Sequence, residues 1–150
     1  NTWFLLAKSY EHTGDLVEAS NAISKALELE PMNTAYQNLH INLGTGLYTT
    51  GRIAEAREVY LKALLHDPTL AEACQNLGVL ELGESRLAEA ERWLRRGTVL
   101  SPDDIQIHLV LGVVLIKAGK PEPAGAGFRR VLSIDPHHQQ ARSALQALNP

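Results

Sequence analysis

The chain has 150 residues, a net charge of −3, 45% hydrophobic and 21% charged side chains. This composition excludes a disordered or fibrous chain, and the slightly negative charge gives no general attraction to nucleic acid or anionic lipid. The longest apolar run, Leu109 to Ile116, is too short to cross a bilayer, so no membrane insertion is expected. A soluble chain in the cytoplasm or the periplasm is compatible with this composition, and the compartment stays undetermined.

Four stretches of the chain end in a proline at nearly constant spacing. The intervals between these prolines are 37, 34 and 34 residues, and the prolines are Pro31, Pro68, Pro102 and Pro136. Within each stretch apolar residues recur at intervals of three and four, which is typical of amphipathic helices. Each stretch is therefore predicted to contain two helices, called here the A helix and the B helix. The proline then ends the B helix, because it cannot donate a backbone hydrogen bond.

The first two repeats are predicted to span 1–33 and 34–70. Asp15 and Glu18 have the spacing of a capping box, which predicts the start of the first B helix. The second repeat contains three extra residues, close to one helical turn. Its A helix is therefore predicted to begin early, near Asn33 or Thr34, and a longer loop is the alternative.

The third repeat is predicted to span 71–104, with its A helix from about Leu70 to Gly83 and its B helix from about Leu87 to Leu100. The fourth repeat is predicted to span 105–138.

The last B helix, within PEPAGAGF, is predicted to be weak, because Gly125 and Gly127 lower helix propensity. Residues 139–149 are predicted to form a terminal cap helix. Its apolar side, with Ala141, Leu145 and Leu148, is expected to face the repeats, and its outer side is polar.

Small residues recur at one position of each A helix. A glycine inside a helix costs about 1 kcal/mol relative to alanine, so its repetition at one position predicts a close contact between A and B helices. These A-helix residues are Ala7, Gly44, Gly78 and Gly112, and the small residues of the B helices are Ala19, Ala56, Ala90 and Ala124.

The repeated positions resemble the tetratricopeptide repeat family, whose pattern is W-x₂-L-G-x₂-Y…A-x₃-F…P over 34 residues. The fourth repeat matches with His108, Leu111, Gly112, Leu115, Ala124, Phe128 and Pro136. The resemblance implies an all-α fold, a right-handed α-solenoid of four helix-turn-helix repeats plus a C-terminal capping helix. It also implies a single array over 1–150 that buries a continuous core between stacked repeats.

In this family the A helices line a concave groove that binds a peptide or a helix of a partner. The groove is predicted to be mixed at its start and apolar at its end. The alternative is that the apolar residues only bury against each other or against the cap. The predicted partner-binding residues are Ile41, Asn42, Thr45, Tyr48, Gln75, Asn76, Val79, Leu82, Leu109, Val113 and Ile116.

A chaperone-binding subset of the family holds C-terminal carboxylates in a clamp of lysine, asparagine and arginine. Lys8 and Asn42 lie at suitable turns of their helices. However, Phe4 takes the place of a lysine, Asn76 stands where an arginine is needed, and the carboxylate of Glu72 stands where a lysine is needed and would repel such a ligand. The sequence therefore predicts that this chain has no carboxylate clamp.

His40, Cys74 and His108 follow one another at steps of 34, and both residue types bind zinc. Equivalent helices of neighbouring repeats lie roughly 10 Å apart, whereas zinc holds its ligands at about 2.0–2.3 Å. We therefore expect these residues to pack in the core, with no metal and no cofactor. No catalytic motif is present, so the chain is not expected to be an enzyme.

The sequence thus predicts a protein–protein interaction scaffold with a protein or peptide partner. The alternatives are a regulatory or targeting module of a larger enzyme or assembly machine, and a homo-oligomerisation module that binds a second copy. Trp3 stands only two residues from the start, so the first A helix lacks its usual beginning. We therefore expect further repeats upstream in the full protein.

Overall fold

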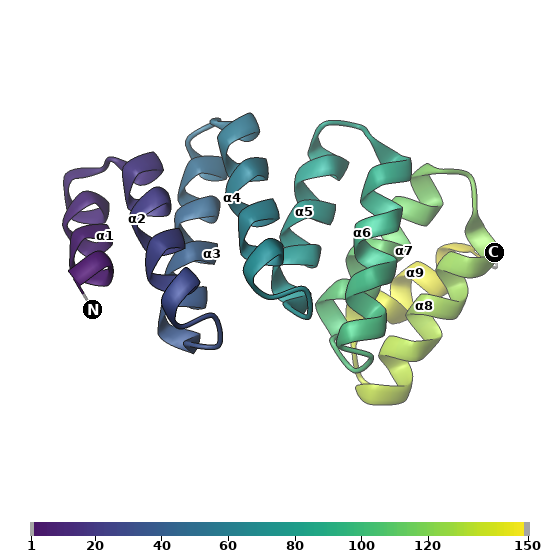
Figure 1. Ribbon diagram of the computed structural model, residues 1–150. Helices are drawn as coiled ribbons and strands as arrows, with labels where there is room; N and C mark the ends of the chain where they lie inside the picture. Colours follow the sequence, from purple (N-terminus) through teal and green to yellow (C-terminus); the bar gives the residue numbers. More distant parts are fainter. Residues whose placement is uncertain (1, 149–150) are drawn as a thin grey trace. The chain divides into compact units, whose positions relative to one another are not determined.

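The computed structural model describes residues 2–148, which contain nine helices and no strand (Figure 1). The prediction of an all-α fold is confirmed. Within the same residues, none of the helices combines the length and the hydropathy that a bilayer crossing requires. The helices are α1 (Thr2–Thr13), α2 (Leu16–Leu29), α3 (Thr34–Thr49), α4 (Ile53–His66), α5 (Ala71–Gly83), α6 (Leu87–Leu100), α7 (Ile105–Lys117), α8 (Pro121–Ile134) and α9 (Gln139–Leu148).

The chain forms two compact parts, 1–76 and 77–150, called here the N-terminal half and the C-terminal half. The boundary falls within α5. In the N-terminal half α2 packs between α1 and α3, and α4 packs on α3. In the C-terminal half α7 packs on both α6 and α8, and α9 covers α8.

Local capping contacts set the starts of the first helices. The side chain of Asp15 accepts a hydrogen bond from the backbone amide of Glu18 at 3.5 Å, as the capping-box spacing predicts. Asn33 caps α3 by accepting from the amides of Ala35 (3.1 Å) and Tyr36 (3.4 Å). Because of this cap α3 begins at Thr34 and reaches 16 residues, so the early start is confirmed and the longer loop is not formed.

The turns between A and B helices require a left-handed residue. Glycine supplies it in three of them, with φ of +83° at Gly14, +79° at Gly51 and +72° at Gly119. In the third repeat Ser85 takes this place with φ of +60°. A residue with a Cβ is strained in this region by about 1–2 kcal/mol, so the turn of the third repeat is less favourable than the others.

The repeated glycines of the A helices lie against large side chains of the B helices. A Cβ on Gly44 would lie 2.6 Å from the ring of Tyr60, and one on Gly112 would lie 2.5 Å from the ring of Phe128. Gly78 meets Leu94 in the same way. The predicted close contact between A and B helices is confirmed, since only glycine leaves room for these side chains.

The two glycines of α8 have different surroundings. The helix forms in full from Pro121 to Ile134, with proline in its first turn, where a missing amide costs little. A Cβ on Gly125 would lie 3.7 Å from Leu145 of α9, and one on Gly127 would lie 3.6 Å from the carbonyl of His108. These are ordinary contact distances, so neither glycine is required by packing.

The cap helix forms as α9 and ends at Leu148, while residue 149 of the predicted range lies outside the described residues. Ala141 is fully buried, as predicted. Leu145 and Leu148 are only half-buried, because a terminal helix has a neighbour on one side alone.

Candidate partner-binding faces of the A helices

In the N-terminal half, the predicted binding residues lie on α3 and on the first turns of α5. Asn42 and Thr45 are exposed, and Tyr48 is half-buried together with Gln75 and Asn76 of α5. Ile41 is different, because it is only 2% exposed and belongs to the packed core. The surface of this half that a partner can reach is therefore polar, with the ring of Tyr48 as its aromatic part.

The exposed hydroxyl of Thr45 is already held by the protein. Its Oγ donates to the carbonyl of Ile41 at 3.1 Å and lies 3.1 Å from the hydroxyl of Tyr60 on α4. Burial raises the pKa of the Tyr60 hydroxyl, so this group stays protonated over the ordinary pH range. The pair links A and B helices of the second repeat at the edge of the face.

In the C-terminal half, the predicted binding residues lie on α5 and α7. Leu109 is 3% exposed and lies in the core. Val79, Leu82 and Val113 are half-buried, and Ile116 is 42% exposed. Val113 and Ile116 follow Val79 and Leu82 by one period of 34, so the same two positions of successive A helices keep apolar surface open. We call these four residues the apolar face of the C-terminal half.

The positions of the carboxylate clamp hold other contacts. Phe4 stacks on Tyr36 with ring centroids 4.8 Å apart, and Lys8 Nζ lies 2.5 Å from Glu11 Oε2. Glu72, at the start of α5, is exposed. An incoming carboxylate would thus meet a stacked ring, an ammonium already paired with a carboxylate, and a like charge. The contacts agree with the prediction that this chain has no clamp.

The three residues at steps of 34 make packing contacts. His40 is fully buried, and its Nε2 is hydrogen-bonded to the Ser20 hydroxyl at 3.1 Å. Desolvation by burial, with the nearby His66 and Lys62, lowers the pKa of His40 to about 3, so its imidazole is neutral. Cys74 is fully buried, and His108 Nε2 bonds the carbonyl of Pro102 at 2.8 Å. Among residues 2–148, no cluster of three or more His, Cys, Asp or Glu could hold a metal ion.

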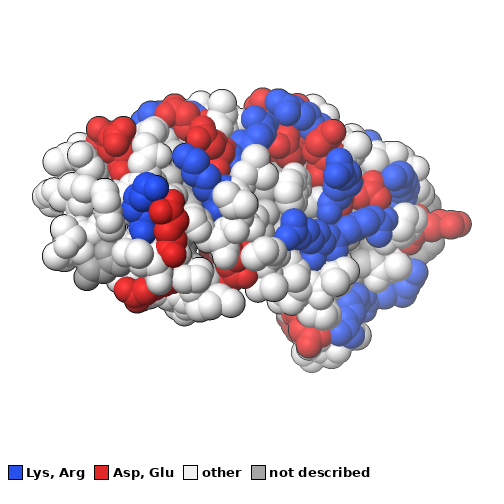
Figure 2. Space-filling view, viewed as in Figure 1, with Lys and Arg blue, Asp and Glu red and all other residues white. Residues whose placement is uncertain are grey.

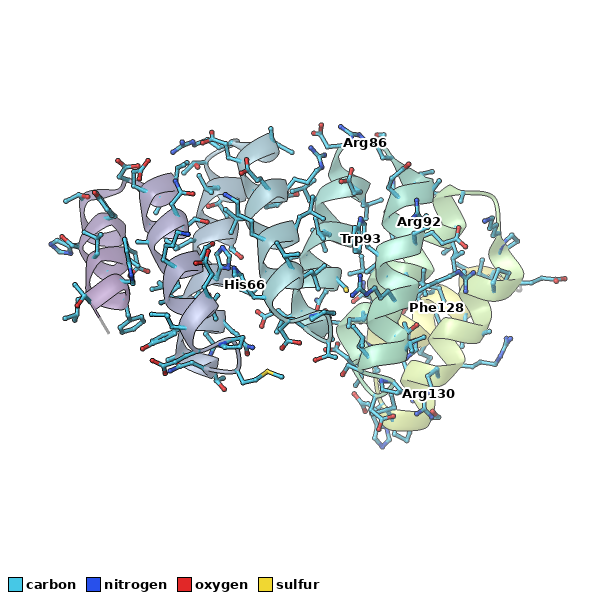
Figure 3. All side chains as sticks on the ribbon, in the orientation of Figure 1. His66, Arg86, Arg92, Trp93, Phe128 and Arg130 are labelled. Atoms are coloured by element: carbon cyan, nitrogen blue, oxygen red, sulfur yellow. The ribbon has the colours of Figure 1, made fainter. Side chains whose placement is uncertain are left out.

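Sequence reasoning did not single out a basic surface of the C-terminal half. Lys and Arg side chains gather over α6 and α8 (Figure 2), where Arg92 and Arg130 lie on the viewed side (Figure 3). Many of these cations have acidic or aromatic partners. Glu91 receives both Arg95 at 2.9 Å and Lys120 at 2.8 Å, and the hydrogen bond from Lys120 lowers the pKa of its carboxyl.

Two further contacts involve this basic surface. Arg130 pairs with Asp103, and the guanidinium of Arg96 lies 5.9 Å from the centroid of the Trp93 ring. The spacing of four between Glu91 and Arg95 is the one signal of these contacts that the sequence carries. Because so many of the cations are engaged, this surface is mainly a solvated network of ion pairs.

Helices paired through small residues, with the period of 34, define this chain as a helical repeat protein. The family model of the tetratricopeptide repeat matches residues 1–33 and 37–70, and the same positions recur in the two later repeats. The chain belongs to the tetratricopeptide repeat family.

Solved structures agree with this fold. The crystal structure of MamA superimposes with a TM-score of 0.74 at 24% identity, covering 95% of this chain and 82% of that chain. The first TPR of Spaghetti (RPAP3), bound to the HSP90 peptide SRMEEVD, superimposes with a TM-score of 0.70 at 20% identity, covering 75% of this chain and 89% of that chain.

Among curated proteins, the human Protein O-mannosyl-transferase TMTC3 is 26% identical over 148 residues. The match covers 86% of this chain and 16% of the relative, so the chain spans about a sixth of the length of that protein.

Proposed function

We propose that this chain is a protein-interaction scaffold that binds an apolar peptide or helix of a partner on its A helices. The observation that carries the proposal is the apolar face of the C-terminal half. Val79, Leu82, Val113 and Ile116 keep apolar surface open at positions that a surface helix would normally fill with polar residues. The equivalent residues of the second repeat, Thr45 and Tyr48, carry hydroxyl groups.

Burial of this face supplies the binding free energy. Apolar surface removed from water contributes roughly 25 cal/mol per Å² before the costs of ordering the partner. A modular site of this size then holds its ligand with an affinity in the micromolar range, near −8 kcal/mol. The acidic HSP90 peptide bound by the RPAP3 repeat is a different kind of ligand, because Lys8 and Glu72 do not offer this chain the charges to hold it.

The chain acts by binding rather than by catalysis in this proposal. Its similarity to a segment of an O-mannosyl-transferase supports the second candidate function, a regulatory or targeting module within a larger enzyme. The two functions are compatible, because the same apolar face would then hold a substrate protein or another subunit. Self-association through this face is the third candidate.

The test is an affinity capture with three forms of the 150-residue chain. Val113→Asp places a carboxylate on the apolar face, where its desolvation opposes binding. Ala88→Asp is the matched control, since it adds the same charge to an exposed position in the first turn of α6, where a negative charge is tolerated.

The proposal expects a partner that is retained by the original chain and by Ala88→Asp, and lost with Val113→Asp. A partner retained equally by all three forms would show that the apolar face is not the site. Light scattering at several concentrations separates partner binding from self-association.

A further inference from the structure

The first repeat has a second apolar surface, apart from the A-helix faces. One side of α1 presents Trp3, which is 42% exposed, and Leu6, which is 37% exposed, followed by the half-buried Tyr10. These side chains and four residues of α2 line an open cleft of about 300 Å³, called here the first-repeat cleft. The α2 residues are Glu18, Asn21, Ala22 and Lys25.

The structure shows what covers the equivalent side of the next A helix. One period of 37 residues takes Trp3, Leu6 and Tyr10 to His40, Leu43 and Leu47 of α3. These three residues are at most 1% exposed, because α2 packs against this side of α3. The hydrogen bond between Ser20 of α2 and His40 of α3 is part of the same contact.

The α2 side of the cleft has the same relation to the next B helix. The same period takes Glu18, Asn21, Ala22 and Lys25 to Glu55, Glu58, Val59 and Lys62 of α4. Those four residues face Val17, Ser20 and Asn21 of α2 across a small opening. Lys62 Nζ donates to Asn21 Oδ1 at 3.4 Å. In the second repeat, therefore, α2 is the element that occupies the cleft between the A and B helices.

We propose that the first-repeat cleft is a docking site for an amphipathic helix from outside residues 1–150, which adds to the repeats in the place that α2 takes on the second repeat. Continuity with the interface of α2 defines the chemistry of this helix. It presents a narrow face of small side chains at spacing i, i+3, i+4 and i+7. In α2 that face is Val17, Ser20, Asn21 and Ser24.

Two details of the cleft refine the expected partner. An acceptor at the place of Asn21 would receive a hydrogen bond from Lys25, as Asn21 does from Lys62. Trp3 is larger than His40, so the residue facing it should be as small as alanine or glycine. The terminal helix α9 of a second copy does not fit, because it exposes the polar Gln140, Arg142 and Gln146.

The probe is a fluorescent peptide with the sequence of residues 15–30, DLVEASNAISKALELE, because this helix fills the equivalent cleft. It is titrated with the 150-residue chain and observed by fluorescence anisotropy. A free peptide of this length must first become helical, so the expected Kd is about 10–100 µM. A peptide with Ser20→Arg should bind at least about tenfold more weakly, because the long side chain obstructs the close approach.

The protein variants are Leu6→Asp and its matched control Leu5→Asp. Leu6 lies on the cleft, outside the core cluster of this half, so its variant should fold, which circular dichroism checks. Leu5 lies on the same helix, is 68% exposed, and corresponds to the exposed Asn42. We expect Leu6→Asp to weaken peptide binding at least about tenfold and Leu5→Asp to leave it unchanged.

Three results would overturn the proposal. The first is absence of peptide binding, and the second is equal binding by the original chain and Leu6→Asp, which would mean that the peptide binds elsewhere or replaces α2 itself. The third is a dimer in sedimentation that Leu6→Asp dissolves, which would make a second copy the occupant. None of these results depends on the apolar face of the C-terminal half, so the proposed scaffold function is tested separately.

Discussion

The same substitution, glycine to alanine, should have opposite effects at two glycines of the fourth repeat. Gly112 lies on α7, and an added Cβ would lie 2.5 Å from both Cε1 and Cζ of the Phe128 ring, which is itself buried. Gly125 lies on α8, where an added Cβ would meet the mobile end of Arg129 at 3.3 Å and Leu145 at 3.7 Å. The two sites therefore separate helix propensity from packing.

Alanine gains about 1 kcal/mol of helix propensity over glycine in either helix. At Gly125 little opposes this gain, so the free energy of unfolding should rise by about 1 kcal/mol. At Gly112 the buried ring or the helix must move, and overpacking of this kind costs about 1–3 kcal/mol. We expect a net loss of about 1–2 kcal/mol at Gly112 after the propensity gain is subtracted.

The assay is urea unfolding followed by far-UV circular dichroism, with the original chain and both variants measured together. The account requires the midpoint to rise for Gly125→Ala and to fall for Gly112→Ala. If both variants are stabilised alike, the A and B helices of this repeat are not in the close contact described. If Gly125→Ala is the destabilised variant, α9 packs on α8 more tightly than the structure shows.

Three further predictions concern the pH dependence and the local contacts of the fold. Because the pKa of His40 is about 3 in the folded chain, the unfolded chain binds one more proton as pH falls below the ordinary value near 6.5, and stability should decrease by about 2 kcal/mol between pH 7 and pH 5. In His40→Cys, which copies the residue of the third repeat, unfolding curves at the two pH values should lack this part of the decrease. Ser85→Gly should raise the unfolding free energy by about 0.5–1 kcal/mol by relieving the positive φ, and an unchanged melting curve would contradict this. Tyr60→Phe removes the contact with Thr45 and should cost about 0.5–1.5 kcal/mol, with Tyr48→Phe as a control, as no hydrogen bond of the Tyr48 hydroxyl enters this account.

Local signals in the sequence determined most of the helix boundaries. The predicted B helix from Leu87 to Leu100 is found at these residues, and the predicted start of the third A helix at Leu70 differs by one residue. Periodicity, caps and prolines act within a few residues of the boundary, so they can be read without knowledge of the tertiary structure.

The depth of burial could not be predicted in the same way. Ile41 and Leu109 have the correct helical phase for the binding face, but the packing of neighbouring helices buries them. The contact between His40 and Ser20 joins residues of different helices, and the period of the repeat gives no sign of it. Phase follows from one helix alone, whereas exposure depends on how closely its neighbours approach.

The partial exposure of the apolar face was expected from its composition. The equivalent positions change from Thr45 and Tyr48 to Val79 and Leu82, and this change is visible in the sequence. The identity of the partner has no comparable signal, because the spacing of the repeat is common to proteins with very different ligands.

The most direct test of the interaction scaffold is a calorimetric titration of the captured partner segment at low and high salt. Three forms of the chain are compared: the original, Val113→Asp and Lys8→Ala. Apolar burial predicts a negative heat-capacity change and an affinity that barely changes with salt, since little Coulomb attraction is screened. Val113→Asp should abolish binding, and Lys8→Ala should leave it unchanged. Binding that high salt and Lys8→Ala both eliminate, while Val113→Asp binds normally, would contradict the apolar face and assign the partner to a charged site.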